Sequence, residues 1–160
     1  MLQFFEACHF CICSKYSPDG ISPIGTTFQG NTKIRYFDEL QYFTISSLNN
    51  FNNCSNLVRV SINSPNVSFG YLHCRTKAGC RWNVIRMKTT GFTSTYATDS
   101  MSNLTFIFRQ NSVVAVQSGM RGFGNIKIYV PDNLVDTYKT SGNWTSYASR
   151  IHPISEYTGD

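Results

Sequence analysis

Residues 51–62 read FNNCSNLVRVSI, and this stretch predicts the fold of the chain. Its apolar residues are Phe51, Cys54, Leu57, Val60 and Ile62, at steps of 3, 3, 3 and 2. Asparagine and serine fill the first gaps, which is typical of a turn, and the alternation that follows is typical of a strand. A single turn-and-strand unit cannot bury its apolar side alone. We therefore expect copies of the unit to stack on one another.

Weaker copies of the unit recur along the chain. Residues 28–37 align with residues 51–60 at an offset of 23, with Phe28 on Phe51 and Asn31 on Cys54. Residues 102–108 match residues 55–61 at an offset of 47, and a further copy begins at Gly124. A degenerate copy falls at residues 80–85. Strand starts are therefore predicted near Ile34, Leu57, Val84, Leu104 and Ile126.

The end of the chain, from Pro131 onward, differs in kind from the repeats. After Pro131, apolar residues fall at helical spacing, and residues 141–143 (SGN) interrupt that helix. Trp144, Tyr147, Ala148 and Ile151 then follow at i, i+3, i+4 and i+7, which predicts a second short amphipathic helix. We expect an N-terminal extension over residues 1–24, a stack of repeats over 25–130, and a helical cap over 131–160.

These residues carry a family resemblance. The unit at 51–62 resembles the BspA-type leucine-rich repeat, whose coils read roughly F-x-x-C-x-x-L-x-x-V/I-x-I/L. Residues 126–157 look like the terminal module that closes such arrays in proteins of Bacteroides-type gut bacteria and their phages. The resemblance covers about residues 25–157, and residues 63–100 depart from its pattern. It implies a β-rich α/β solenoid: a right-handed leucine-rich-repeat superhelix of about 4–5 coils with a short helical cap. Such folds serve adhesion or binding, so the resemblance supplies no catalytic residue and no cofactor.

Charge is low overall and uneven along the chain. The net charge is +5, and charged residues make up 14% of the 160 residues, against about a quarter in typical domains. Between Glu39 and Asp99 every charged residue is basic: Arg59, Arg75, Lys77, Arg81, Arg86 and Lys88. This stretch, with Trp82, could attract nucleic acid, an anionic glycan or lipid headgroups. Nucleic-acid domains are usually more basic, which favours a solvated surface.

The six cysteines raise the question of a metal site. Residues 8–13 read CHFCIC, and three thiols with one imidazole could bind zinc together with His73, Cys74 and Cys80. Structural zinc sites usually show two well-separated ligand pairs, and the second pair here is loose. Buried core thiols are therefore favoured over disulfides and over metal. Cys54 is explained by its position in the repeat.

The pattern of polar residues does not favour an enzyme. A hydrolase needs a nucleophile, a base and a group that orients the base. The serines lack a Gly-x-Ser-x-Gly context, and His152 stands beside Pro153 after the last helix. Asp38 and Glu39 are adjacent and would point to opposite faces of a strand. We predict no enzymatic activity, no metal and no cofactor.

The leading functional hypothesis is recognition through the strand face of the solenoid. The partner would be a protein or glycan on a host or neighbouring cell surface. The candidate binding residues alternate with the apolar positions: Arg35, Arg59, Ser61, Thr105, Ile107, Lys127 and Tyr129. Enrichment in aromatic and arginine side chains at such a face is typical of binding.

Two other functions remain open at this point. One is a structural role in a gut bacteriophage virion (tail, fibre or head decoration), in contact with other virion proteins. The other is nucleic-acid binding through residues 75–88, which the charge does not favour. The start, MLQFFEACHFCICS, lacks a basic region and is a poor secretory signal, and no apolar run reaches the roughly 20 residues of a membrane span. We expect a cell-surface location, as part of a longer secreted protein, or a virion.

Overall fold

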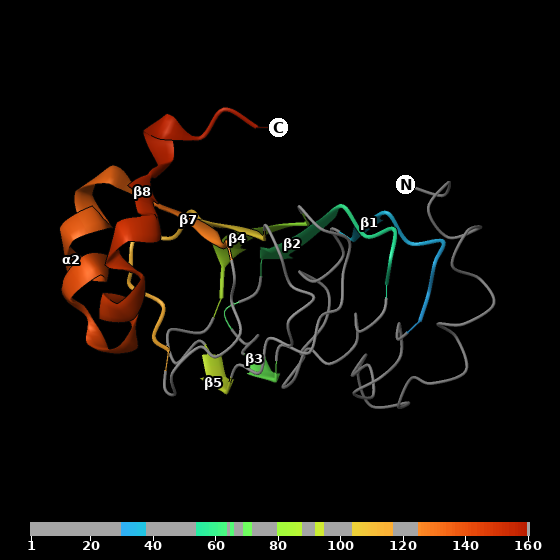
Figure 1. Ribbon diagram of the computed structural model, residues 1–160, viewed down its shortest axis with the longest axis horizontal. Coiled ribbons are helices and arrows are strands. Elements are labelled where there is room, and N and C mark those ends of the chain that lie inside the picture. The colour runs from blue at the N-terminus through green and yellow to red at the C-terminus, as the bar shows by residue number, and fades with distance from the viewer. Residues whose placement is uncertain are drawn as a thin grey trace.

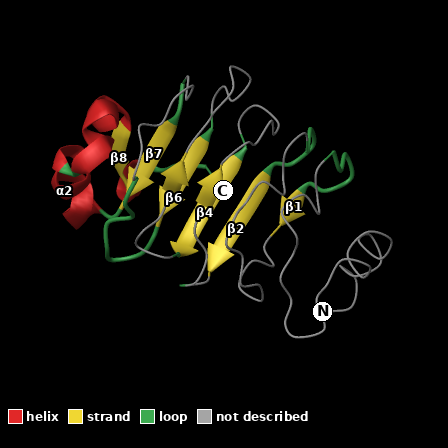
Figure 2. Cartoon of the chain, turned by 90° about the horizontal axis from the view of Figure 1, so that it is seen from below, coloured by secondary structure: helices red, strands yellow, loops and turns green. Residues whose placement is uncertain are grey.

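A parallel β-sheet of six strands is the main element of the computed structural model (Figure 1). The structure describes residues 30–37, 54–63, 65, 69–71, 80–87, 92–94, 104–116 and 125–159. The six strands, in their order across the sheet, are β1 (Tyr36–Phe37), β2 (Arg59–Asn63), β4 (Arg81–Arg86), β6 (Thr105–Phe108), β7 (Lys127–Val130) and β8 (Ile151–Pro153). Strand order therefore follows chain order, as Figure 2 shows with the strands side by side. With its few helices, the molecule has an α/β architecture.

A second, smaller sheet lies between these strands in the chain. Strands β3 (Phe69–Tyr71) and β5 (Phe92–Ser94) pair in parallel. Since β3 follows β2 and β5 follows β4, the chain visits the two sheets in alternation over residues 59–108. Figure 1 shows the small sheet on one side of the large one. Parallel neighbours need a crossover of about a dozen residues or more, and the intervening segments meet that requirement.

The register of the large sheet repeats at a nearly constant interval. Tyr36 pairs with Arg59, Arg59 with Arg81, Arg81 with Thr105, and Thr105 with Lys127, so that each strand repeats the one before it at nearly the same offset. The predicted strand starts at Ile34, Leu57, Leu104 and Ile126 lie just before β1, β2, β6 and β7. Val84 lies inside β4, after its start at Arg81, because the copy of the repeat there is the most divergent.

Apolar residues at every second strand position form the core. One buried row crosses all six strands in register: Phe37, Val60, Trp82, Phe106, Ile128 and Ile151. Aromatic rings stack along it, with 6.2 Å between the ring centroids of Trp82 and Phe106. Because successive strand side chains point to opposite faces, this row fixes which face of the sheet is internal.

Turns before the strands complete the core. Cys54 is fully buried, which agrees with its interpretation as a repeat position. In the preceding copy Asn31 takes that place, and its side-chain oxygen accepts the backbone N–H groups of Lys33 (2.8 Å) and Ile34 (3.2 Å). The amide of Asn56 donates to the Thr32 carbonyl at 2.8 Å and ties one turn to the next. An asparagine at this position accepts hydrogen bonds from backbone N–H groups of the turn, which a cysteine thiol would leave to other acceptors.

Short helices close one end of the core. They are η3 (Asp132–Leu134), α2 (Val135–Thr140), η4 (Gly142–Arg150) and η5 (Ile154–Glu156). Tyr138 and Trp144 are buried, with ring centroids 5.8 Å from Phe108. The Trp144 indole N–H donates to the Val114 carbonyl at 2.6 Å, and the Tyr138 hydroxyl accepts the Val114 N–H at 3.0 Å. Among the described residues, no helix has the length and apolar character needed to cross a membrane.

The structure corrects one sequence prediction in this region. The apolar spacing predicts a second helix that includes Ile151, but η4 ends at Arg150 and Ile151 begins β8. Ile151 pairs with Ile128 and joins the buried row. The spacing of residues 144–151 fits a helix. However, Pro153 disfavours helical backbone at the preceding residue, His152, so the chain is extended there. Residues 1–24 lie outside the described residues.

We predict that replacing Phe108 with alanine removes the contact between sheet and cap. Phe108 is fully buried and packs on Phe106, Tyr138 and Trp144. The free energy of unfolding should fall by about 3–5 kcal/mol, as for other buried phenylalanines. Urea denaturation measures this change. The exposed Asn111→Ala variant is the control, with an expected change within about 0.5 kcal/mol. Equal stability of the two variants would contradict the packing described here.

Tyr138 should make the stability of the protein depend on alkaline pH. Burial raises the pKa of its phenol from 10.0 to about 12. The neutral phenol is thus favoured in the folded state. The contribution of the neutral phenol to the free energy of unfolding is fully present below the unfolded pKa of 10.0, and it is lost as pH rises toward about 12. The loss amounts to about 2–3 kcal/mol.

The matched variant is Tyr138→Phe. At neutral pH it leaves the buried Val114 N–H without this acceptor, at a cost of about 1–3 kcal/mol. Between pH 10 and 12, however, its unfolding free energy should fall less steeply than that of the wild type. Urea denaturation at pH 8, 10 and 11.5 measures both effects, and parallel pH profiles would refute the assignment.

Candidate binding face on the parallel sheet

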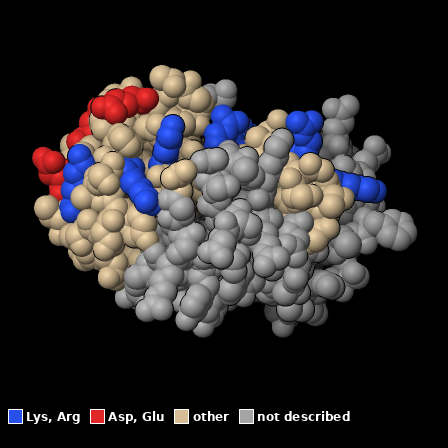
Figure 3. Space-filling view, viewed as in Figure 1, with Lys and Arg blue, Asp and Glu red and all other residues tan. Residues whose placement is uncertain are grey.

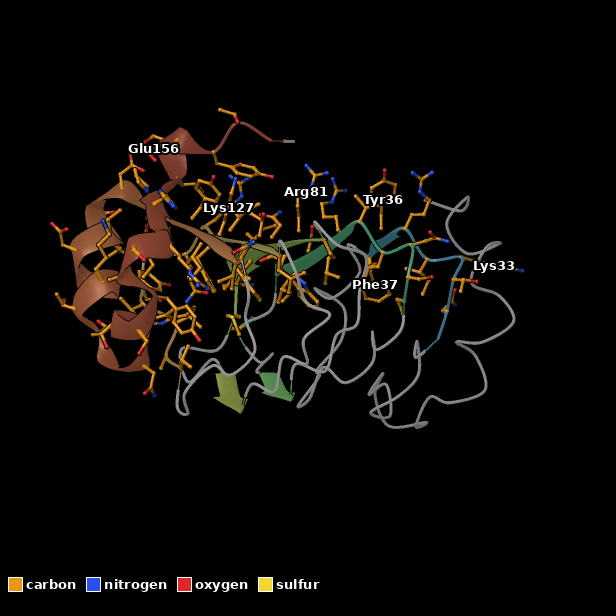
Figure 4. The ribbon with its side chains drawn as sticks, in the orientation of Figure 1. Lys33, Tyr36, Phe37, Arg81, Lys127 and Glu156 are labelled. Atoms are coloured by element: carbon orange, nitrogen blue, oxygen red, sulfur yellow. The ribbon has the colours of Figure 1, made fainter. Side chains whose placement is uncertain are left out.

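The five residues Tyr36, Arg59, Arg81, Thr105 and Lys127 form one row across the sheet, here called the outer ladder. Each stands one position before a buried residue of the core row, so its side chain points to the opposite face. Figure 4 shows Tyr36, Arg81 and Lys127 on one side of the sheet and Phe37 on the other. Strand pairing therefore brings the sequence-predicted residues Arg59, Thr105 and Lys127 into a single line.

One end of the outer ladder combines an exposed aromatic ring with two arginines. Tyr36 is 43% exposed, a high value for a large apolar side chain. The guanidinium of Arg59 lies 5.3 Å from its ring centroid, and that of Arg35 lies 5.8 Å away. Cation–π contacts of this kind hold the long arginine side chains in place at little cost. Arg35, the first sequence-predicted residue, thus joins the outer ladder through Tyr36.

Three of the five residues of the outer ladder are basic: Arg59, Arg81 and Lys127. Arg59 and Arg81 are direct register partners on adjacent strands, which lie about 4.8 Å apart. The described carboxylates, Asp132, Asp136 and Glu156, all follow β7 in the chain. Figure 3 shows the described Asp and Glu side chains gathered at one end of the molecule, with the described Lys and Arg spread farther along it. Among the described residues, positive charge therefore predominates on the outer ladder.

A second outer row contains the remaining candidates. Ser61, Asn83, Ile107, Tyr129 and His152 pair in register across β2 to β8. The exposure expected from alternation does not hold at two of them: Ser61 is 8% exposed and Ile107 is 2% exposed. Tyr129 is half-buried and packs against the ring of Tyr157, near the end of the chain.

The segment after β8 returns across this face of the sheet (Figure 1). The ring of Tyr157 lies 5.0 Å from that of Tyr129 on β7, and the carbonyl of Gly159 accepts a hydrogen bond from Arg81 on β4 at 3.3 Å. A segment that touches both β7 and β4 passes over β6 between them. We call residues 156–159 the tail.

Sequence reasoning missed three residues of this face. Tyr36 could have been found, because the offset that aligns residues 28–37 with 51–60 places it opposite Arg59. Arg81 stands out in the sequence only as part of a basic stretch, since the repeat is degenerate there. His152, assigned to the cap, lies 5.7 Å from Tyr129 between ring centroids and 3.5 Å from Glu156 between Nδ1 and Oε2. Its position depends on β8, which the sequence did not predict.

The cysteines of the described residues belong to the core. Cys54 and Cys80 are free thiols and fully buried. In the part of the chain that the structure describes, no group of three or more His, Cys, Asp or Glu side chains could hold a metal ion. The other proposed zinc ligands, Cys8, His9, Cys11, Cys13, His73 and Cys74, lie outside the described residues. So do Asp38, Glu39, Arg75, Lys77 and Lys88.

Comparison with protein-family models, with curated proteins and with solved structures gives no match for this chain. The function is therefore inferred from the geometry of the outer ladder and the tail. The BspA-type resemblance remains a prediction from the residues quoted for it.

Burial predicts that Cys54 is chemically inert in the folded protein. Removal from water raises the pKa of the Cys54 thiol, and a hydrogen bond from the Asn31 backbone lowers it by a smaller amount. The pKa is therefore raised overall, and little thiolate forms. Alkylation by iodoacetamide at pH 8 should be at least about tenfold slower than in 8 M urea, because only open molecules react. Peptide mass spectrometry measures the labelling of Cys54 and Cys80 separately. Equal rates in buffer and in urea would show that Cys54 is accessible.

Proposed function

We propose that the chain is a non-enzymatic recognition or adhesion module that binds a protein or glycan through the outer ladder. We further propose that its sheet belongs to a right-handed leucine-rich-repeat solenoid of BspA type. Strand order that follows chain order, a nearly constant offset between register partners and alternation between two parallel sheets support this fold. Connections between parallel strands of one sheet are right-handed in about 98% of cases, which supports the hand.

The observation that carries the functional proposal is the composition of the outer ladder. Tyr36, Arg59, Arg81 and Lys127 share one face in consecutive or nearly consecutive strands. Tyrosine and arginine are enriched at the residues that dominate binding energy in interfaces. An anionic partner would be complementary in charge to Arg59, Arg81 and Lys127. On a cell surface the partner would be a protein or glycan, and in a virion it would be another virion protein.

The test compares two charge reversals of equal size. The variant Arg59→Glu/Lys127→Glu alters the outer ladder and leaves Arg81 and the tail in place. The control Lys33→Glu/Lys139→Glu makes the same change in net charge in the exposed turn before β1 and on α2. Wild type, variant and control are applied to arrays of neutral, sulfated and uronic-acid glycans and of acidic and basic peptides.

We expect a ligand class that wild type and control bind equally and that the ladder variant binds about 10- to 100-fold more weakly. Binding to that class should also weaken as salt rises from about 0.05 to 0.5 M, since the contacts are partly exposed. The same affinity for wild type and ladder variant on every array would refute recognition through this face. Circular dichroism confirms that the variants fold.

A further inference from the structure

The tail is the part of the molecule whose position has no explanation in the core. Its residues lie on the outer face, where Tyr157 packs on Tyr129 and Gly159 accepts a hydrogen bond from Arg81. The buried rows that stabilise the sheet lie on the opposite face. The proposed binding face is thus already partly occupied by a segment of the same chain.

The contacts of the tail indicate which ligand chemistry the face accepts. The Arg81 guanidinium donates a hydrogen bond to a backbone carbonyl, so this position of the face binds a peptide backbone. An aromatic ring meets Tyr129 at 5.0 Å and an interplanar angle of 60°, a favourable tilted geometry. Acidic residues flank Tyr157 in the sequence, Glu156 before it and Asp160 after it. Their charge is complementary to Arg59, Arg81 and Lys127 on the outer ladder.

The fit of the tail is incomplete. The hydroxyl of Tyr157 is buried without a hydrogen-bond partner among the described residues. A buried hydroxyl left in this state opposes docking, because it has given up its hydrogen bonds to water. Gly159 lies close to the Tyr157 ring, since a Cβ there would stand 3.4 Å from the hydroxyl oxygen. In its present place the tail therefore leaves one buried hydroxyl unsatisfied among the described residues.

We propose that the outer face is a peptide-binding surface, that the tail occupies it in the free protein, and that the partner displaces the tail. The partner is an extended acidic peptide segment that carries a tyrosine. This inference rests on the proposed function, and it narrows the partner from a protein or glycan to a peptide. Charge complementarity and the fact that a peptide segment, the tail, already contacts this face favour a peptide over a glycan.

The first experiment measures binding of a probe with the sequence of the tail. The probe is a fluorescent synthetic peptide of residues 154–160, ISEYTGD, and its control is ISEATGD. Tethering gives the tail an effective concentration on the order of millimolar, so it competes strongly with the probe in the full-length wild type. In full-length Tyr157→Ala that competition is weakened. The probe should therefore bind the variant about tenfold or more tightly than the wild type.

Matched variants separate competition from other effects. Arg81→Ala added to Tyr157→Ala should abolish the gain, because the face loses the donor to the peptide carbonyl. Lys139→Ala should bind the probe as the wild type does, and the control peptide should bind every variant weakly. Tyr157→Ser serves if Tyr157→Ala fails to fold. Equal affinity of wild type and Tyr157→Ala for the probe would overturn the proposal.

A second measurement detects displacement directly. In isotope-labelled wild type, a nuclear Overhauser effect between the rings of Tyr129 and Tyr157 should be present and should vanish as unlabelled probe is added. Its absence in the free protein, or its persistence at saturating probe, would overturn the proposal. Ladder-dependent binding of a glycan with no response to the probe would overturn the peptide inference alone. No ladder-dependent binding of any kind would overturn the proposed function as well.

Discussion

Parallel pairing of strands at a nearly constant sequence interval is the constraint on which the rest of the structure depends. It brings together residues that are far apart in the chain but equivalent in the repeat. When one position of the repeat is apolar, pairing converts it into a continuous buried row, from Phe37 to Ile151. The burial of that row supplies the driving force that no single short strand of this sheet could generate.

The same constraint explains how much of the fold the sequence could predict. Periodicity is a local signal, so the offset between residues 28–37 and 51–60 located β1 and β2, and the later copies located β6 and β7. Cys54 was assigned to packing for the same reason, and it is fully buried. The prediction was least accurate at β4, where Cys80 stands directly before the strand in the place that Leu104 and Ile126 take before β6 and β7. The leucine or isoleucine that marks a strand start in the other copies is therefore missing there.

The features that the sequence could not predict depend on contacts between distant segments. Ile151 has the spacing of a helix residue, and only the open edge of β7 makes it a strand residue. Ile107 alternates correctly for an exposed position, yet it is 2% exposed. The hydrogen bond from Arg81 to Gly159 spans 78 residues. Local rules of alternation and capping carry no information about such pairs.

Stability and recognition place opposite demands on the two faces of this sheet. The inner row tolerates only apolar side chains of suitable volume, because pairing stacks each on the next. The outer ladder is free of that demand, and it carries three basic side chains and an exposed aromatic ring. The tail sets an acceptor against Arg81 and a ring against Tyr129. The Tyr157 hydroxyl stays unsatisfied among the described residues. A face that its own chain covers imperfectly is, as we propose, one that a better-matched peptide occupies.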